Sequence, residues 1–243
     1  MKKKAVVSLL VIGLAVLAIA GGTLAWFTWQ VDVDDNVFTA GTLKIEAGES
    51  WEVGQEVTNW NPGDCEDKEV WVKVTGSKGV YLRFKINDGW WQLNDDEEWV
   101  EWNLGMLVNP VSYGLNDAWV KKSDGWYYYT GGRVEPESDE INAISKVCLL
   151  GSAGNDFQGK QYRIGFEFEA IQTTHEAVFE AWKVGYINCN FTDSNGQPAN
   201  IKGWYPVNKV DDIWTMVVGL DKFEWTPTGA AESNVGGWNP ATP

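Results

Sequence analysis

The only histidine in the 243 residues is His175, and it opens the run His175-Glu176-Ala177-Val178-Phe179. In zinc peptidases of the zincin type, two histidines one helical turn apart bind the metal, and the glutamate beside the first one acts as the base. Here Phe179 stands where the second histidine is required. Because catalytic zinc sites with fewer than two nitrogen or sulfur ligands are uncommon, the run predicts no metal site and no catalytic residue.

Other patterns that could support chemistry are incomplete. No Gly-x-Ser-x-Gly nucleophile elbow occurs. The segment Gly154 to Lys160 fits Gly-x-x-x-x-Gly-Lys, but Gln161 stands where a phosphate loop needs a Ser or Thr hydroxyl. The acid run Asp95 to Glu98 lacks the glycine and the distal glutamate of an EF-hand, so we expect a solvated loop, with calcium binding left open. These patterns predict a protein that is not an enzyme and has no cofactor.

Tryptophan is unusually frequent, with 16 copies in the chain. The rings can fill a core, or their flat apolar faces can stack on sugars. We expect mainly core tryptophans. The alternative is a secreted carbohydrate-binding or adhesive module, and its candidate stacking residues are Trp90, Trp91 and Trp126.

Charge and cysteine content limit the partners and the compartment. The formal net charge is −15, and such a negative field argues against binding nucleic acid or anionic membrane surfaces. Three cysteines, Cys65, Cys148 and Cys189, allow one disulfide in an exported protein. All three pairings remain open at this point.

The N-terminus has the pattern of a secretory signal. Lys2 to Lys4 precede an apolar run over 5–20, and Thr23 and Ala25 occupy the −3 and −1 positions of a small-residue cleavage site. We predict a signal peptide over 1–25, with cleavage between Ala25 and Trp26. The alternative is an uncleaved anchor, for which the run is marginal in length. With cleavage, the product has no stable membrane anchor and is secreted to the extracellular or cell-surface matrix.

The segment after the cleavage site alternates strictly. Phe27, Trp29, Val31 and Val33 fall on one side, with polar residues between them. This period of two predicts a strand with one buried face, within an N-terminal arm over 26–38.

The remainder predicts an all-β sandwich with a short helix and irregular loops. A hairpin at 77–79 is expected to join strands 69–74 and 80–86. Thr174 is expected to cap a helix over 174–183, and 89–124 is expected to be loops with short strands. The other predicted strands are 42–47, 126–130, 141–150, 162–170 and 213–218.

Four blocks in order resemble the TasA/camelysin family of exported bacterial proteins. They are 21–27 with 36–43, then 61–64, then 80–86, and finally 125–129 with 166–172. The resemblance covers 1–185 and implies a jelly-roll-like β-sandwich over 39–185 that assembles into biofilm-matrix fibres or pili. It leaves 186–243 as an extension of unknown role. Some camelysin-type members are classed as metallopeptidases, an activity that the lone His175 makes unlikely to apply here.

The resemblance also implies that an N-terminal strand passes into the next subunit, which agrees with the alternating arm. We therefore expect a structural fibre subunit whose main partner is a copy of itself. Related minor subunits or matrix polysaccharide are further candidate partners. The residues expected to carry polymerisation are Trp26, Phe27, Trp29, Val31 and Val33. The alternative is a terminal strand that pairs within its own domain, and the acceptor groove is not identified by the sequence.

Overall fold

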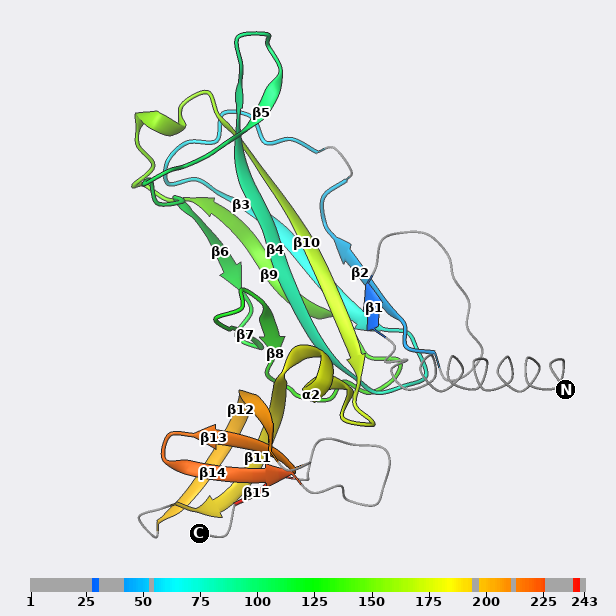
Figure 1. The fold of residues 1–243 in the computed structure, drawn as a ribbon. Helices are drawn as coiled ribbons and strands as arrows, with labels where there is room; N and C mark the ends of the chain where they lie inside the picture. The colour runs from blue at the N-terminus through cyan, green and yellow to red at the C-terminus, as the bar shows by residue number, and fades with distance from the viewer. Residues whose placement is uncertain are drawn as a thin grey trace, which may run out of the picture.

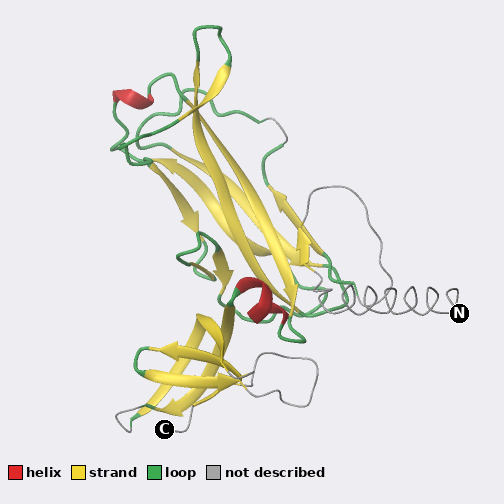
Figure 2. Ribbon diagram, in the orientation of Figure 1, coloured by secondary structure: helices red, strands yellow, loops and turns green. Residues whose placement is uncertain are grey.

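The computed structural model describes residues 28–30, 42–52, 55–193, 197–210, 213–225 and 238–240. They form three antiparallel sheets with one short α-helix (Figures 1 and 2). The prediction of an all-β sandwich is confirmed. The predicted signal peptide and its cleavage site, Ala25-Trp26, lie outside the described residues.

Two of the sheets make the sandwich. Sheet A has the order β1-β10-β4-β8-β7, and β5 pairs with the far end of β4. Its strands are β1 (Thr28–Gln30), β4 (Val80–Leu93), β5 (Trp99–Trp102), β7 (Trp119–Lys121), β8 (Tyr127–Tyr129) and β10 (Gln161–Gln172). Sheet B has the order β2-β3-β9-β6. Its strands are β2 (Ile45–Glu49), β3 (Cys65–Val74), β6 (Val111–Leu115) and β9 (Ile141–Leu149).

The first core lies between these sheets and follows the predicted alternation. In sheet B, Val70, Val72 and Val74 are at most 2% exposed, and in sheet A, Leu82 and Phe84 are fully buried. Phe84 stacks on Tyr127 with ring centroids 4.8 Å apart. Burial of such side chains is worth about 1.5–3 kcal/mol each, which makes this alternation the main determinant of the sandwich.

The predicted hairpin at 77–79 is wrong. Residues 75–79 connect β3 in sheet B to β4 in sheet A, so the chain crosses between the layers there. Both strands bury their apolar residues in the same core. Alternation shows which face of a strand is buried, but it does not identify the strand's neighbour.

The extension after 185 is a third sheet, of which the sequence predicted only 213–218. It runs in the order β11-β12-β13-β14-β15. Its strands are β11 (Val184–Thr192), β12 (Pro198–Val210), β13 (Ile213–Val218), β14 (Asp221–Trp225) and β15 (Trp238–Pro240). We call it the C-terminal sheet. Gly203, at φ 145°, interrupts the alternation of β12, which helps to explain why that strand was missed.

A second core joins the C-terminal sheet to the outer face of sheet A. Tyr81, Tyr128 and Ile171 project from that face and are fully buried. Trp204 of β12 packs edge-on against Tyr81, with ring centroids 5.0 Å apart, and its Nε1 donates a hydrogen bond to the Tyr129 carbonyl at 2.7 Å. The side of β4 that alternation assigned to solvent is therefore covered at this end.

Within the described residues there is one α-helix, α2, which spans Ala177–Trp182 and lies in the second core. It is shorter than the predicted 174–183. Thr174 does not cap it: Glu176 is the N-cap residue, in the left-handed region at φ 60°, and makes no side-chain cap hydrogen bond. The helix is held by burial, because Val178 and Phe179 are fully covered.

Arg83 of β4 contacts side chains from sheet A and from α2. Its guanidinium lies between two indole rings, 4.1 Å from the centroid of Trp126 and 4.4 Å from that of Trp182. It also forms an ion pair with Glu169 at 2.6 Å and donates a hydrogen bond to the Tyr128 hydroxyl at 3.0 Å. Burying a charge requires such compensation, so this site fixes α2 against sheet A.

A disulfide joins Cys65 of β3 to Cys148 of β9, and Cys189 is free. The pairing that the sequence left open is thereby resolved. Both cysteines lie at the end of the sandwich where β4 continues into β5, which we call the hairpin end (Figure 1).

Removing this disulfide tests its contribution to stability. The cysteines are 83 positions apart, and constraint of the unfolded chain by a loop of this size is worth about 2–4 kcal/mol. Cys65→Ser with Cys148→Ser should lower the free energy of unfolding, measured in urea, by that amount. The control Cys189→Ser should cost less than about 1 kcal/mol. Equal losses in the two variants would contradict this account.

Candidate functional site

In sheet A, β10 is completely paired on one side and only partly paired on the other. On one side all of its residues, Gln161 to Gln172, pair with β4. On the other side the described residues of β1 pair with it at three positions: Thr28 with Ile171, Trp29 with Ala170, and Gln30 with Glu169. Within the described residues, 161–168 have no strand beside them on that side. We call this stretch the open edge of β10.

Burial along the inner face of β10 falls where pairing with β1 stops. Ala170 is 1% exposed and Phe168 is 6% exposed. The next inner-face residues, Phe166, Ile164 and Tyr162, are only partly buried, although they pack against the first core. Along this stretch no described strand lies beside β10 on that side, and its inner-face apolar side chains are incompletely covered. A strand edge of this kind can accept an added strand.

A buried lysine lies between the sheets near this edge. Lys68 of β3 is 2% exposed, and its Nζ lies 2.7 Å from Glu49 Oε2, 4.4 Å from the Trp51 ring centroid and 5.9 Å from that of Phe166. The pairing of β3 with β9 shifts register between Asp67 and Val70, at the position of this inward-facing lysine. The cation is paired, as a buried charge must be, so its role here is structural.

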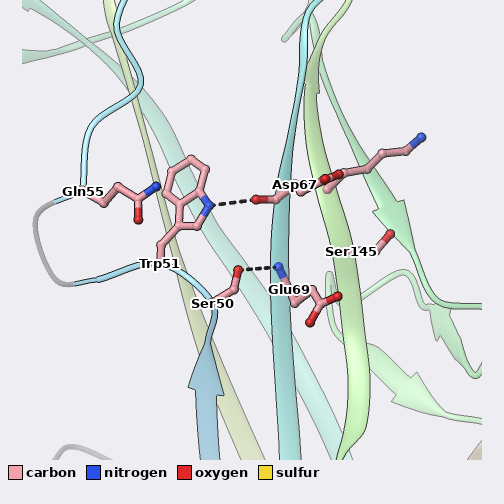
Figure 3. A pocket seen from close by; sticks show the side chains of 7 residues that line it. Ser50, Trp51, Gln55, Asp67, Glu69 and Ser145 are labelled. Atoms are coloured by element: carbon pink, nitrogen blue, oxygen red, sulfur yellow. Dashed lines mark hydrogen bonds between the residues drawn. The ribbon is translucent and has the colours of Figure 1, made fainter.

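Trp51 also forms one wall of a shallow hollow of about 680 Å³ on sheet B. In Figure 3 its Nε1 donates to the Asp67 carbonyl at 2.8 Å, and the Ser50 hydroxyl accepts from the Glu69 N–H at 3.0 Å. These bonds anchor the segment after β2 to β3. The other lining residues are Gln55, Ser145 and Lys146. The set holds no nucleophile with an adjacent base, and we assign no chemistry to the hollow.

The His175 motif lacks a metal-binding geometry. His175 is exposed, precedes α2 and has a φ of 57°, whereas Phe179 is fully buried. Glu176, the would-be base, accepts a hydrogen bond from Trp214 Nε1 at 2.6 Å and lies 3.9 Å from Lys209 Nζ. In the part of the chain that the structure describes, no three His, Cys, Asp or Glu residues are grouped to hold a metal ion.

The three predicted sugar-stacking residues differ in exposure. Trp90 is 3% exposed and packs against Phe157 and Tyr162, with centroids 4.8 and 5.1 Å away, so its prediction as an exposed platform is wrong. Residues 89–93 continue β4 rather than forming a loop, which turns Trp90 inward. Trp91 and Trp126 are partly exposed, and each has a guanidinium over its ring, that of Arg163 at 4.8 Å and of Arg83 at 4.1 Å. Sugar binding at Trp91 and Trp126 stays a prediction.

Sequence reasoning missed a polar cluster that joins the two sheets at the hairpin end. Asp88 Oδ2 accepts hydrogen bonds from Tyr113 OH at 2.8 Å, Tyr162 OH at 2.5 Å and Asn109 Nδ2 at 2.9 Å. Burial is the main reason that the pKa values of Tyr113 and Tyr162 are raised, so both remain protonated donors at physiological pH. Because Tyr113 lies in the segment 89–124 that was expected to be loops, and Asp88 lies just before it, no strand pattern pointed to this contact.

Hydrogen exchange should reveal the open edge. Successive amides of a strand point to opposite sides, so alternate amides from Gln161 to Phe168 should exchange quickly while their neighbours, bonded to β4, exchange slowly. At 169–171 pairing with β1 should protect both sets. Uniform protection along β10 in the monomer would show that the edge is covered.

Peptidase activity should be absent. His175 is the only histidine, and the motif is broken at Phe179. We expect casein to stay intact when the purified protein is added with zinc, both for the wild type and for His175→Ala. Cleavage by the wild type that the substitution abolishes would overturn this expectation.

Comparison with known proteins gives a match to a family model over the N-terminal part of the chain. Residues 1–87 match the family model described as camelysin metallo-endopeptidase. No curated protein matches the chain. The family description implies a metal ion, but the described residues do not fit one, for the reasons given at His175. No helix in the described residues is long and apolar enough to cross a bilayer. Over residues 1–87 the chain is therefore similar to the camelysin family, in agreement with the resemblance of its first sequence motifs.

Proposed function

We propose that this chain is a structural subunit of an extracellular fibre or biofilm matrix, and that it polymerises by donating its N-terminal strand to the next copy. The observation that carries the proposal is the open edge of β10, whose inner-face side chains are half-buried. An exposed, apolar strand edge favours pairing with another chain unless it is covered. A donated strand would cover it.

The register of β1 indicates how the donor fits. Trp29 pairs with Ala170, and the same register extended along a donated strand brings Val31 opposite Phe168 and Val33 opposite Phe166. Residues directly opposite in an antiparallel pair share a face. The apolar side of the arm would then meet the inner face of β10, where burial is incomplete.

The length over which the donated strand can pair with β10 is limited. In this register Asp35 would fall opposite Ile164, which packs against the first core. Burying an unpaired carboxylate is costly, so we expect regular pairing to end near Asp34. The acid thus limits the donor strand to a defined length.

The energetics allow a stable link. Burying Phe27, Trp29, Val31 and Val33 at about 1.5–3 kcal/mol each contributes roughly 6–12 kcal/mol before losses. Ordering the arm and joining two molecules subtract from this, while the backbone bonds along the open edge add to it. The pairing of β1 within its own chain uses the same register over three residues. It would compete with a donated strand and favour the monomer at low concentration.

Deleting residues 26–33 tests the proposal directly. The deletion should give a folded protein that forms no fibres in electron micrographs, because the strand acts in the neighbour's sheet. Trp29→Asp should have nearly the same effect, since it places a charge on the apolar side of the donor. Thr28→Asp is the matched control, with the charge on the opposite side, and should still polymerise.

A peptide copying residues 26–35 should stop the growth of wild-type fibres. It should also slow exchange of the alternate amides over 161–168. Fibres formed by the deletion variant would show that the strand is not the link. Protection of 161–168 in the monomer that the deletion removes would favour the alternative, in which the strand serves only its own domain.

A further inference from the structure

Exposed large apolar side chains gather at the two ends of the molecule. At the hairpin end they form one group, which we call the hairpin-end surface: Leu93, Trp99, Val100, Met106, Leu107, Val108 and Leu150. In the C-terminal sheet they form a second group, the C-terminal surface: Val210, Ile213, Val217 and Leu220. No other exposed large hydrophobic occurs in the described residues. Figure 1 shows β5 and the C-terminal sheet at opposite ends.

Both surfaces point away from the cores. Met106 and Val108 are 101% and 84% exposed, and Leu220 is 89% exposed. In β13, Ile213 and Val217 alternate with Trp214 and Met216, which are buried in the second core. Grouped apolar side chains that are left in solvent commonly mark a contact surface.

The polarity of strand donation brings these two ends together. A donor that continues the register of β1 runs antiparallel to β10, with residue 28 at Ile171. It therefore travels toward Gln161, which pairs with Trp91 near the start of the β4–β5 hairpin. The body of the donor subunit then lies beyond the hairpin end of the acceptor.

The donor's own body begins at its opposite end. Thr42, the first described residue after the arm, accepts a hydrogen bond from Ser77 N–H at 2.9 Å, next to the crossing from β3 to β4. The same end of the sandwich holds Gln172, paired with Val80, and continues into α2 and the C-terminal sheet. The eight residues 34–41 span at most about 28 Å when extended, so this end must stay near the acceptor's hairpin end.

We propose that copies of this chain make a second contact, in which the hairpin-end surface of one subunit packs against the C-terminal surface of the subunit whose strand it has accepted. The inference rests on the proposed strand donation. The contact joins two different surfaces, so each added subunit presents a free surface for the next one, as growth of a filament requires. It also gives the C-terminal sheet a role in assembly.

Cross-linking tests the contact in assembled fibres. Met106→Cys and Leu220→Cys are made as separate proteins, each with Cys189→Ser, mixed, polymerised and oxidised. The mixture should give a covalent dimer that links position 106 of one copy to position 220 of another, and neither protein alone should. Ser123→Cys, in the exposed turn before β8, replaces either partner as a control and should give no dimer.

Removal of the side chains supplies a second measurement. Met106→Ser with Val108→Ser, and separately Val217→Ser with Leu220→Ser, should each raise the critical concentration for polymerisation about tenfold. All four together should raise it little further, because both pairs act in one contact. The melting temperatures of the monomers should be unchanged, since these side chains are exposed.

The failures of the two proposals are distinguishable. Fibres that need residues 26–33 but show no 106–220 link and unchanged critical concentrations would leave strand donation standing and overturn the end contact. Equal cross-linking by the Ser123→Cys control would also overturn it. Absence of wild-type fibres, or fibres from the 26–33 deletion, would overturn both proposals.

Discussion

The first part of β4, Val80 to Phe84, is enclosed on both of its faces, and the rest of the structure depends on that constraint. Leu82 and Phe84 fill the space between sheets A and B, while Tyr81, on the opposite face, is enclosed by the C-terminal sheet. Arg83, the next residue on that face, lies between Trp126 and Trp182 instead of extending into solvent. One strand therefore contributes side chains to both cores. Because β10 pairs with β4 along its full length, packing in the two cores also fixes the position of β10.

This arrangement explains why the open edge can exist in a stable protein. The register and inward face of β10 are set from the β4 side, so β10 does not need a full partner on its other side to stay ordered. Lys68, paired with Glu49 beneath Trp51, stabilises the space between the sheets near Phe166. A rigid edge of this kind can bind an incoming strand without first having to fold.

Alternation predicted most of the sandwich, because strands with one apolar face carry their orientation in the sequence. The valines of β3 and the inner-face residues of β4 were identified in this way. The neighbours of each strand were not, since the crossing at 75–79 and a hairpin have the same local signals. The C-terminal sheet was mostly missed. Tyr81, Tyr128 and Ile171 lie on the face of sheet A that alternation assigns to solvent, so the sequence did not indicate that another sheet packs on them. The alternating arm after the predicted cleavage site was visible in the sequence, whereas the open edge depends on which strands pair and could be identified only from the fold.

The second core also has a consequence for comparison with chains that resemble this one. Tyr81, Tyr128 and Ile171 are buried only because α2 and the C-terminal sheet cover them. A relative that ends soon after the sandwich would present these three positions to water and should carry polar residues there, without a tryptophan pair around the arginine. The residue types at positions 81, 128 and 171 thus form a short signature. They indicate whether a related chain possesses the additional sheet, even when only part of its sequence is known.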